Sequence, residues 1–269
     1  MPIKLIVTDL DDTLLRRDKT ISDYTAEVFK QCRAQGILIA FATARGGRSI
    51  KRWVEQIQPD ALITSGGARA RRGEQEIYNC NLPKELANEL LQLCMAEPSV
   101  GYITVDTTHN LLVNKAFDVG DPLWRDFAHA LMMEFAGGID CNAQKIAVEF
   151  DDPYAAARIA AKFDEVATLH WTGEKWHQLS HKNATKKHAV EAVAKHFGVA
   201  IEDVVAFGDD HNDVGMLELA GIGVAMQNAI DKVKAAADDI CGSCDEDGVA
   251  QWLEQNVLIE KQTQAQLQQ

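Results

Sequence analysis

Apolar residues fall into short runs near both ends of the chain, and amphipathic stretches lie between these runs. Short runs that are apolar at nearly every position are typical of strands buried on both faces of a parallel sheet. We expect such strands at 3–8, 36–43, 61–65, 203–208 and 221–226, with a short last strand near Ile240. Helical spacing of apolar residues predicts helices at 22–34, 47–57, 185–197, 212–220 and 229–237. This alternating order predicts an α/β fold with a doubly wound parallel sheet.

The middle of the chain has a different pattern, with alternating apolar and polar positions and turn residues between them. We expect hairpin strands at 101–107 and 110–115, a strand at 145–150 and a second hairpin over 166–180 around Gly173. Helices are expected at 83–97, 122–135 and 153–163. Alternation and hairpins indicate an antiparallel sheet. The sequence therefore predicts an α+β domain, residues 82–179, inserted into a discontinuous core formed by residues 1–81 and 180–269.

Polar residues follow three of the expected parallel strands directly. The first strand is followed by Asp9, Asp11 and Asp12, and the second by Thr43, Ala44 and Arg45; the fourth is followed by Asp209, Asn212 and Asp213. Ligands of open parallel sheets bind beyond the carboxyl ends of the strands, where these segments would meet. We therefore expect one site, built from residues far apart in the sequence.

Clustered carboxylates repel one another unless a cation lies between them. Mg²⁺ prefers oxygen ligands and is commonly held by carboxylates, water and phosphate, so the pattern predicts a Mg²⁺ site. A carboxylate aligned with a phosphorus atom is a potential nucleophile. Arg45 lies at an expected helix start, where a cation is unfavourable without an anion, and this favours a place near phosphate. Asp213 has a second interpretation, as the N-cap of the helix that follows it.

The overall charge limits the classes of partner. The formal net charge of −13 and the pI of about 5.0 disfavour binding to nucleic acid or to anionic lipid. No segment reaches the roughly 18–20 consecutive apolar residues of a membrane span, and the first residues do not resemble a signal peptide. We therefore expect a cytoplasmic protein that is a monomer or a homodimer.

The spaced motifs resemble those of the haloacid dehalogenase (HAD) superfamily, in its Cof-type branch. Asp9-Leu-Asp11-Asp-Thr13 is similar to the first motif, Thr43 to the second, and Gly208-Asp209-Asp-His-Asn212-Asp213 to the fourth. The third motif is a lone lysine, for which the register favours Lys186 over Lys182 and Lys187. The inserted domain resembles the large α/β cap of that branch. The segment Ser65-Gly66-Gly67-Ala68 departs from it, because Gly66 stands where Asn is common.

The resemblance implies a role for each matching residue. Asp9 would attack phosphorus, and Asp11 would serve as general acid and base. Mg²⁺ would be bound by Asp9, Asp209 and the Asp11 main-chain carbonyl. The substrate phosphate would be held by Asp9, Thr43, Ala44, Arg45 and Lys186. Asn212 and Asp213 would orient the metal ligands or the lysine.

The expected function is Mg²⁺-dependent hydrolysis of a small phosphorylated metabolite, such as a sugar phosphate, a nucleotide or a phosphorylated cofactor. Three alternatives stay open at this point. A phosphomutase of the same superfamily would use the same residues. A phospho-receiver module also uses clustered Asp, Thr and Lys but has no inserted domain of this size. A metal-free dehalogenase has no use for an acid at Asp11.

Overall fold

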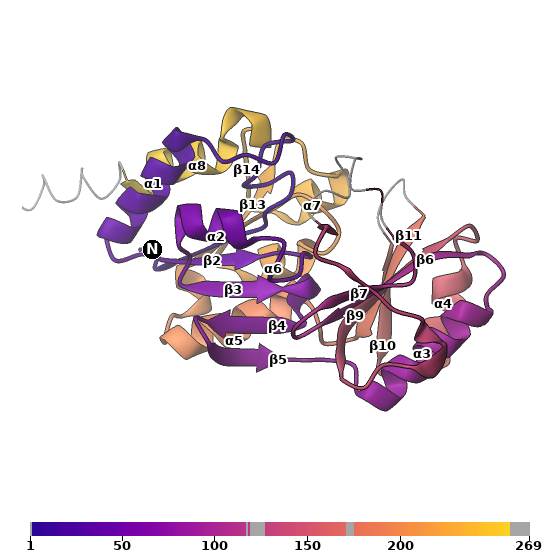
Figure 1. Cartoon of the computed structure of the whole chain (residues 1–269). Coiled ribbons are helices and arrows are strands. Elements are labelled where there is room, and N and C mark those ends of the chain that lie inside the picture. The colour runs from indigo at the N-terminus through magenta and orange to yellow at the C-terminus, as the bar shows by residue number, and fades with distance from the viewer. Residues whose placement is uncertain (1, 117, 119–126, 171–174, 259–269) are drawn as a thin grey trace, which may run out of the picture. The chain divides into compact units, whose positions relative to one another are not determined.

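The computed structural model describes residues 2–116, 118, 127–170 and 175–258. The chain forms two compact units (Figure 1). The core unit consists of Met1–Tyr78 and Thr185–Gln269, and the inserted unit consists of Asn79–Ala184. That the inserted unit serves as a cap stays a prediction.

The core unit contains an eight-stranded sheet in the order β14-β13-β12-β1-β2-β3-β4-β5. The strands are β1 (Leu5–Thr8), β2 (Leu38–Ala42), β3 (Ala61–Thr64), β4 (Arg69–Arg72), β5 (Gln75–Asn79), β12 (Val204–Gly208), β13 (Ile222–Met226) and β14 (Asp239–Cys241). The strands from β14 to β3 pair in parallel, and β4 runs antiparallel to β3. The chain winds outward from β1 in one direction and from β12 in the other. The predicted doubly wound α/β fold is confirmed.

Helices flank this sheet, and their ends follow local signals in the sequence. They are α1 (Asp23–Ala34), α2 (Lys51–Ile57), α5 (Lys186–Phe197), α6 (Val214–Leu219), α7 (Asp231–Ala236) and α8 (Gly248–Leu253). The Ser22 side chain caps α1 by accepting a hydrogen bond from the amide of Thr25. Thr185 caps α5 in the same way, and Gly198 ends that helix in a left-handed conformation. Helix α1 contacts both α2 and α8, and helix α6 contacts both α5 and α7 (Figure 1).

The inserted unit contains a six-stranded sheet in the order β10-β11-β9-β6-β7-β8. Its strands are β6 (Val100–Thr107), β7 (Leu111–Val113), β8 (Leu131–Met132), β9 (Ala143–Phe150), β10 (Val166–His170) and β11 (Trp176–His181), and its helices are α3 (Lys84–Ala96) and α4 (Ala155–Ala160). All neighbouring strands are antiparallel except β7 and β8. The two helices pack on the apolar side chains of the sheet and form a separate hydrophobic core.

The predicted helix at 122–135 is wrong over its described part. Residues 127–135 contain the short strand β8, which pairs with β7, and the Met133 amide donates to the Val113 carbonyl at 2.9 Å. An apolar run rich in Leu, Met and Phe fits a helix or a buried strand, and here pairing with a neighbouring strand decides. Residues 122–126, the turn at Gly173 and the tail 262–269 lie outside the described residues.

Candidate active site

The candidate site lies where the strand order of the core sheet reverses, between β1 and β12. Thr8 at the end of β1 pairs with Phe207 of β12 on one side and with Phe41 of β2 on the other. The Asp9 amide donates to the Phe207 carbonyl at 3.0 Å, which fixes Asp9 at the level of Gly208. The carboxyl ends of the strands at such a reversal form the usual ligand crevice of open α/β sheets.

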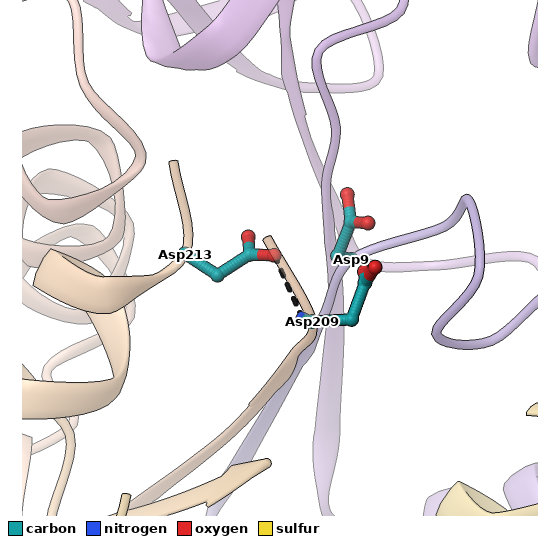
Figure 2. Close-up of side chains that lie close together, drawn as sticks. All are labelled: Asp9, Asp209 and Asp213. Carbon is teal, nitrogen blue, oxygen red and sulfur yellow. Dashed lines mark hydrogen bonds between the residues drawn. The ribbon is translucent and has the colours of Figure 1, made fainter. Parts of the chain in front are cut away.

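Three carboxylates from these strand ends lie together. One oxygen each from Asp9, Asp209 and Asp213 falls within 4.8 Å of the others, and Figure 2 shows Asp213 reaching them from the start of α6. We call these residues the acidic triad. Burial and mutual repulsion raise the pKa of Asp9 to about 7 and that of Asp209 to about 9. Clustered carboxylate oxygens with raised pKa values fit a hard divalent cation, which would relieve the repulsion.

Among the residues described, Lys186 has the only cationic side chain that is buried against the triad. Its Nζ lies 2.6 Å from Asp9 Oδ1 and 2.6 Å from Asp213 Oδ1, and its side chain has no exposed surface. Burial alone would lower the pKa of Lys186, but Asp213 and Asp9 raise it above its usual value. The two rival lysines are both exposed, and Lys182 Nζ donates to the Asp164 carbonyl in the inserted unit. Lys187 follows Lys186 on α5.

A glycine determines how the start of α5 reaches the site. Gly67 lies in the short 3₁₀ turn Ser65–Gly67 that follows β3, with a φ of 100°. A β-carbon at Gly67 would overlap the Thr185 carbonyl and the Lys186 amide nitrogen. Glycine therefore allows the close backbone approach that brings Lys186 to the end of the parallel sheet.

Asp213 organises the loop after β12. Its Oδ2 accepts hydrogen bonds from the amides of Asp209 at 3.0 Å and Asp210 at 3.1 Å, while its Oδ1 accepts from Lys186. The interpretation of Asp213 as a side-chain cap of α6 is wrong, because its carboxylate bonds backward to the loop and not to the helix. Gly208 makes room for this arrangement, since a β-carbon there would overlap the Asp213 side chain.

The loop after β1 adds two features that our reading of the sequence missed. Thr13 Oγ1 donates to Asp209 Oδ1 at 2.7 Å and so orients a member of the triad. The spacing of the first motif includes Thr13, and that was the available signal. Asp12 has a left-handed backbone with a φ of 55°, which Asp tolerates better than most residues, and its carbonyl accepts from Asn228 at 2.7 Å.

The residues after β2 form the second part of the site. Thr43 is buried, and its Oγ1 accepts from the Arg45 amide at 3.1 Å, so its hydroxyl hydrogen points elsewhere. Ala44 lies in the same bend. The Arg45 side chain was expected near phosphate. In this structure it instead forms an ion pair with the Asp11 carboxylate. Its Nε is 2.6 Å from Asp11 Oδ2, and its Nη2 is 2.8 Å from Oδ1.

The Asp11 carboxylate is therefore separate from the acidic triad. Burial would raise the pKa of Asp11, but hydrogen bonds and charge from Arg45 and Lys19 hold it below the usual value. Lys19 Nζ lies 3.0 Å from Asp11 Oδ1. Asn212 is half-buried between Asp209 and Asp213, and its side chain has no hydrogen bond with any residue in the described part of the chain.

The fold and this site define a hydrolase of phosphate monoesters. The sequence matches the haloacid dehalogenase-like hydrolases over residues 6–253, so the chain belongs to that family, and the predicted resemblance is confirmed. In the described ranges, no helix is both long and apolar enough to cross a membrane.

Related proteins and solved structures agree with this class. A Bacillus subtilis protein named 5-amino-6-(5-phospho-D-ribitylamino)uracil phosphatase is 27% identical over 93% of this chain and 96% of its own length. A Haemophilus influenzae protein named "Putative phosphatase" is 28% identical over 95% of this chain and 98% of its own. The solved structure of a HAD subclass IIB sugar phosphatase superposes with a TM-score of 0.82 at 25% identity, covering 94% of this chain and 98% of that one. Membership in the haloacid dehalogenase-like hydrolases, together with these relatives named as phosphatases, favours a phosphatase over the receiver and dehalogenase alternatives.

Proposed function

We propose that this protein hydrolyses a small phosphorylated metabolite with Mg²⁺ through a phospho-Asp9 intermediate. The observation that carries the proposal is the position of Asp9. It lies at the reversal of the sheet, paired with a buried lysine on one oxygen and close to Asp209. Asp9 Oδ2 accepts no hydrogen bond from any described residue, so it is open to an incoming phosphorus atom or a cation.

The triad supports Mg²⁺ as the cation. Asp9 and Asp209 would hold it, together with the Asp11 main-chain carbonyl, while both oxygens of Asp213 are engaged by Lys186 and by two amides. Asp213 therefore fits an orienting role better than direct coordination. Bound there, Mg²⁺ would neutralise charge on the phosphoryl oxygens.

The chain's own residues supply the remaining steps. The Asp9 carboxylate forms a bond to phosphorus as the bond from phosphorus to the leaving oxygen breaks, and Lys186 offsets negative charge beside it. Asp11 gives a proton to the leaving oxygen and later takes one from the water that hydrolyses the phospho-enzyme. The ionised Asp11 of this structure suits the second step. For the first step the Asp11 carboxyl must hold a proton, and the negative charge of a phosphoryl group bound beside it would favour the protonated form while Arg45 stays in contact with Asp11.

The relatives narrow the class of substrate that we propose. One is named for a phosphorylated ribityl compound and another as a sugar phosphatase. A phosphate ester of a sugar, a sugar alcohol or a related cofactor precursor therefore leads the candidates for this chain, ahead of nucleotides. The net charge of −13 is consistent with a small substrate and not with a nucleic acid.

The proposal is tested by turnover of 4-nitrophenyl phosphate with Mg²⁺ and by mass spectrometry of the acid-quenched enzyme. We expect release of inorganic phosphate, loss of activity when the metal is chelated, and phosphate on the peptide that contains Asp9. The variant Asp9→Asn should be inactive, and activity retained in it would overturn the nucleophile assignment. A panel of sugar and sugar-alcohol phosphates ranked by kcat/KM then identifies the substrate. A mutase would return most of the phosphate to the organic product.

A further inference from the structure

The carboxylate of Asp11 is held by two cations that come from different segments of the core unit. Arg45, after β2, binds it through two nitrogens, and Lys19, in the loop between β1 and α1, binds Oδ1 at 3.0 Å. A two-pronged arginine contact fixes the plane of a carboxylate as well as its distance. The position of Asp11 therefore depends on what holds Arg45 and Lys19 in place.

One side chain contacts both of these cationic residues. Trp53 lies on α2 and is 2% exposed. Its indole Nε1 donates a hydrogen bond to the Lys19 carbonyl at 3.0 Å. Its ring lies under the Arg45 guanidinium, with Arg45 Cζ 5.0 Å from the ring centroid, which is within the range of a cation–π contact. Trp53, Lys19, Asp11 and Arg45 thus form a closed ring of contacts.

The Lys19 backbone shows why the hydrogen bond from Trp53 matters. Lys19 has a φ of 62°, in the left-handed region that L-residues other than Gly, Asn and Asp rarely adopt. Such a conformation costs energy and persists only when neighbouring contacts hold it. The Lys19 amide bonds to the Arg16 carbonyl at 2.8 Å, and the Lys19 carbonyl accepts from Trp53. This turn directs the Lys19 ammonium toward Asp11.

We propose that Trp53 is a positioning residue for Asp11, acting through Arg45 and Lys19. The inference rests on the proposed function, in which Asp11 protonates the leaving oxygen. Among the described residues, no hydrogen bond or ring contact joins Trp53 to the acidic triad or to Lys186, and its ring contacts are with Arg45 and Arg52, so we expect its effect chiefly on the proton-transfer step. Small displacements of a catalytic group lower rates strongly, because proton transfer needs hydrogen-bond distance in the transition state.

The test uses two aryl phosphates whose leaving groups differ in basicity. Phenyl phosphate needs a proton on its leaving oxygen, whereas 2,4-dinitrophenyl phosphate does not. For Trp53→Phe, which keeps the aromatic face and removes the indole N–H, we expect kcat/KM for phenyl phosphate to fall about tenfold or more. The value for 2,4-dinitrophenyl phosphate should stay within about twofold. Lys19→Met, which leaves the packing of Trp53 intact, should show the same selective loss.

A matched control is available in the same unit. Trp252 is also buried and donates its indole N–H to a carboxylate, Asp239 Oδ2, at 2.7 Å. Trp252→Phe therefore loses a comparable hydrogen bond outside the ring around Asp11, and the ratio of its two kcat/KM values should stay at the wild-type level. In an Asp11→Asn background, Trp53→Phe should have no further effect on phenyl phosphate, since there is no acid left to position.

The outcomes separate this inference from the proposed function. If Trp53→Phe and Lys19→Met reduce turnover of both substrates equally, or of neither, while Asp9→Asn is inactive, the positioning role is overturned and the phosphatase proposal stands. If the wild-type enzyme releases no phosphate from 2,4-dinitrophenyl phosphate, or Asp9→Asn still does, the proposed function itself fails. Circular dichroism and unfolding curves identify any variant whose loss reflects misfolding, in which case Lys19→Met decides.

Discussion

Replacement of Lys186 by methionine perturbs the centre of the site with little change in side-chain volume. The substitution removes the ammonium that lies 2.6 Å from both Asp9 and Asp213. The lysine side chain is completely buried, and the two carboxylates are 9% and 0% exposed. Water therefore cannot solvate the two carboxylates that remain. We expect both a loss of stability and a loss of activity.

The size of the stability loss follows from the burial of these groups. Removing one partner of a buried ion pair typically costs about 3–5 kcal/mol, because the other charge stays behind without compensation. Here two carboxylates stay behind, so we expect a value toward the upper end of that range. The loss should shrink as the pH falls, since Asp9, whose pKa is already raised to about 7 by burial, then takes up a proton. Mg²⁺ should also reduce it by supplying charge beside Asp9.

Urea unfolding at pH 8, in the absence of Mg²⁺, measures this loss. Lys187→Met is the matched control, because Lys187 is the next residue on α5 and is exposed, and such surface substitutions usually change stability by no more than about 0.5 kcal/mol. Adding Asp213→Asn to Lys186→Met should recover part of the loss, because one of the stranded charges disappears. The reasoning is refuted if Lys186→Met is as stable as Lys187→Met under these conditions.

Three further predictions concern the same loops. Burial raises the pKa of Asp9 to about 7 and that of Asp209 to about 9, so the metal-free fold keeps protons that the unfolded chain has lost. The stability of the fold should therefore fall between pH 4 and 9, by up to about 1.4 kcal/mol per pH unit for each proton. Mg²⁺ displaces those protons, so its shift of Tm should grow with pH; a shift that does not depend on pH would contradict this. Gly208→Ala should displace Asp213 and lower kcat at least about tenfold, whereas Gly47→Ala, where a β-carbon meets nothing within 4 Å, should be neutral. Asp12→Val should lower the free energy of unfolding by about 1–2 kcal/mol through its left-handed backbone, and Asp12→Gly should not.

The general rules of parallel sheets were enough to predict the convergence of distant segments. Asp9 and Asp209 end neighbouring strands, and the sequence marks both strands by uninterrupted apolar runs. The lysine of the site was harder to predict, because three candidate lysines occur within six positions and the sequence does not show which of them is buried. Lys186 begins α5 and faces the sheet, while Lys187, one residue later, faces solvent.

The spacing of motifs along the sequence does not predict the direction in which each side chain points. Arg45 was expected at a helix start, but α2 begins only at Lys51, so Arg45 lies in the bend after β2 and its guanidinium pairs with Asp11 instead of a phosphate. Trp53 and Lys19 showed no signal in the sequence, because their contacts join α2 to a turn 34 residues earlier. The error at 122–135 has the same origin, because the secondary structure of an apolar run depends on which partner strand lies beside it, and here Leu131 and Met132 pair with β7 while their side chains stay exposed.

The charges of the buried cluster explain why the fold keeps an arrangement that costs stability. Three carboxylates of the triad and one lysine leave a formal charge of −2, which two further buried lysines would have balanced in a purely structural core. A deficit of two charges matches one divalent cation. On the other side, Arg45 and Lys19 lie against Asp11, and Lys19 also lies 3.8 Å from Asp12, so these two cations are already paired with carboxylates. A divalent cation at the triad would therefore supply the charge that this site lacks, and it would also attract the negative charge of a phosphoryl group.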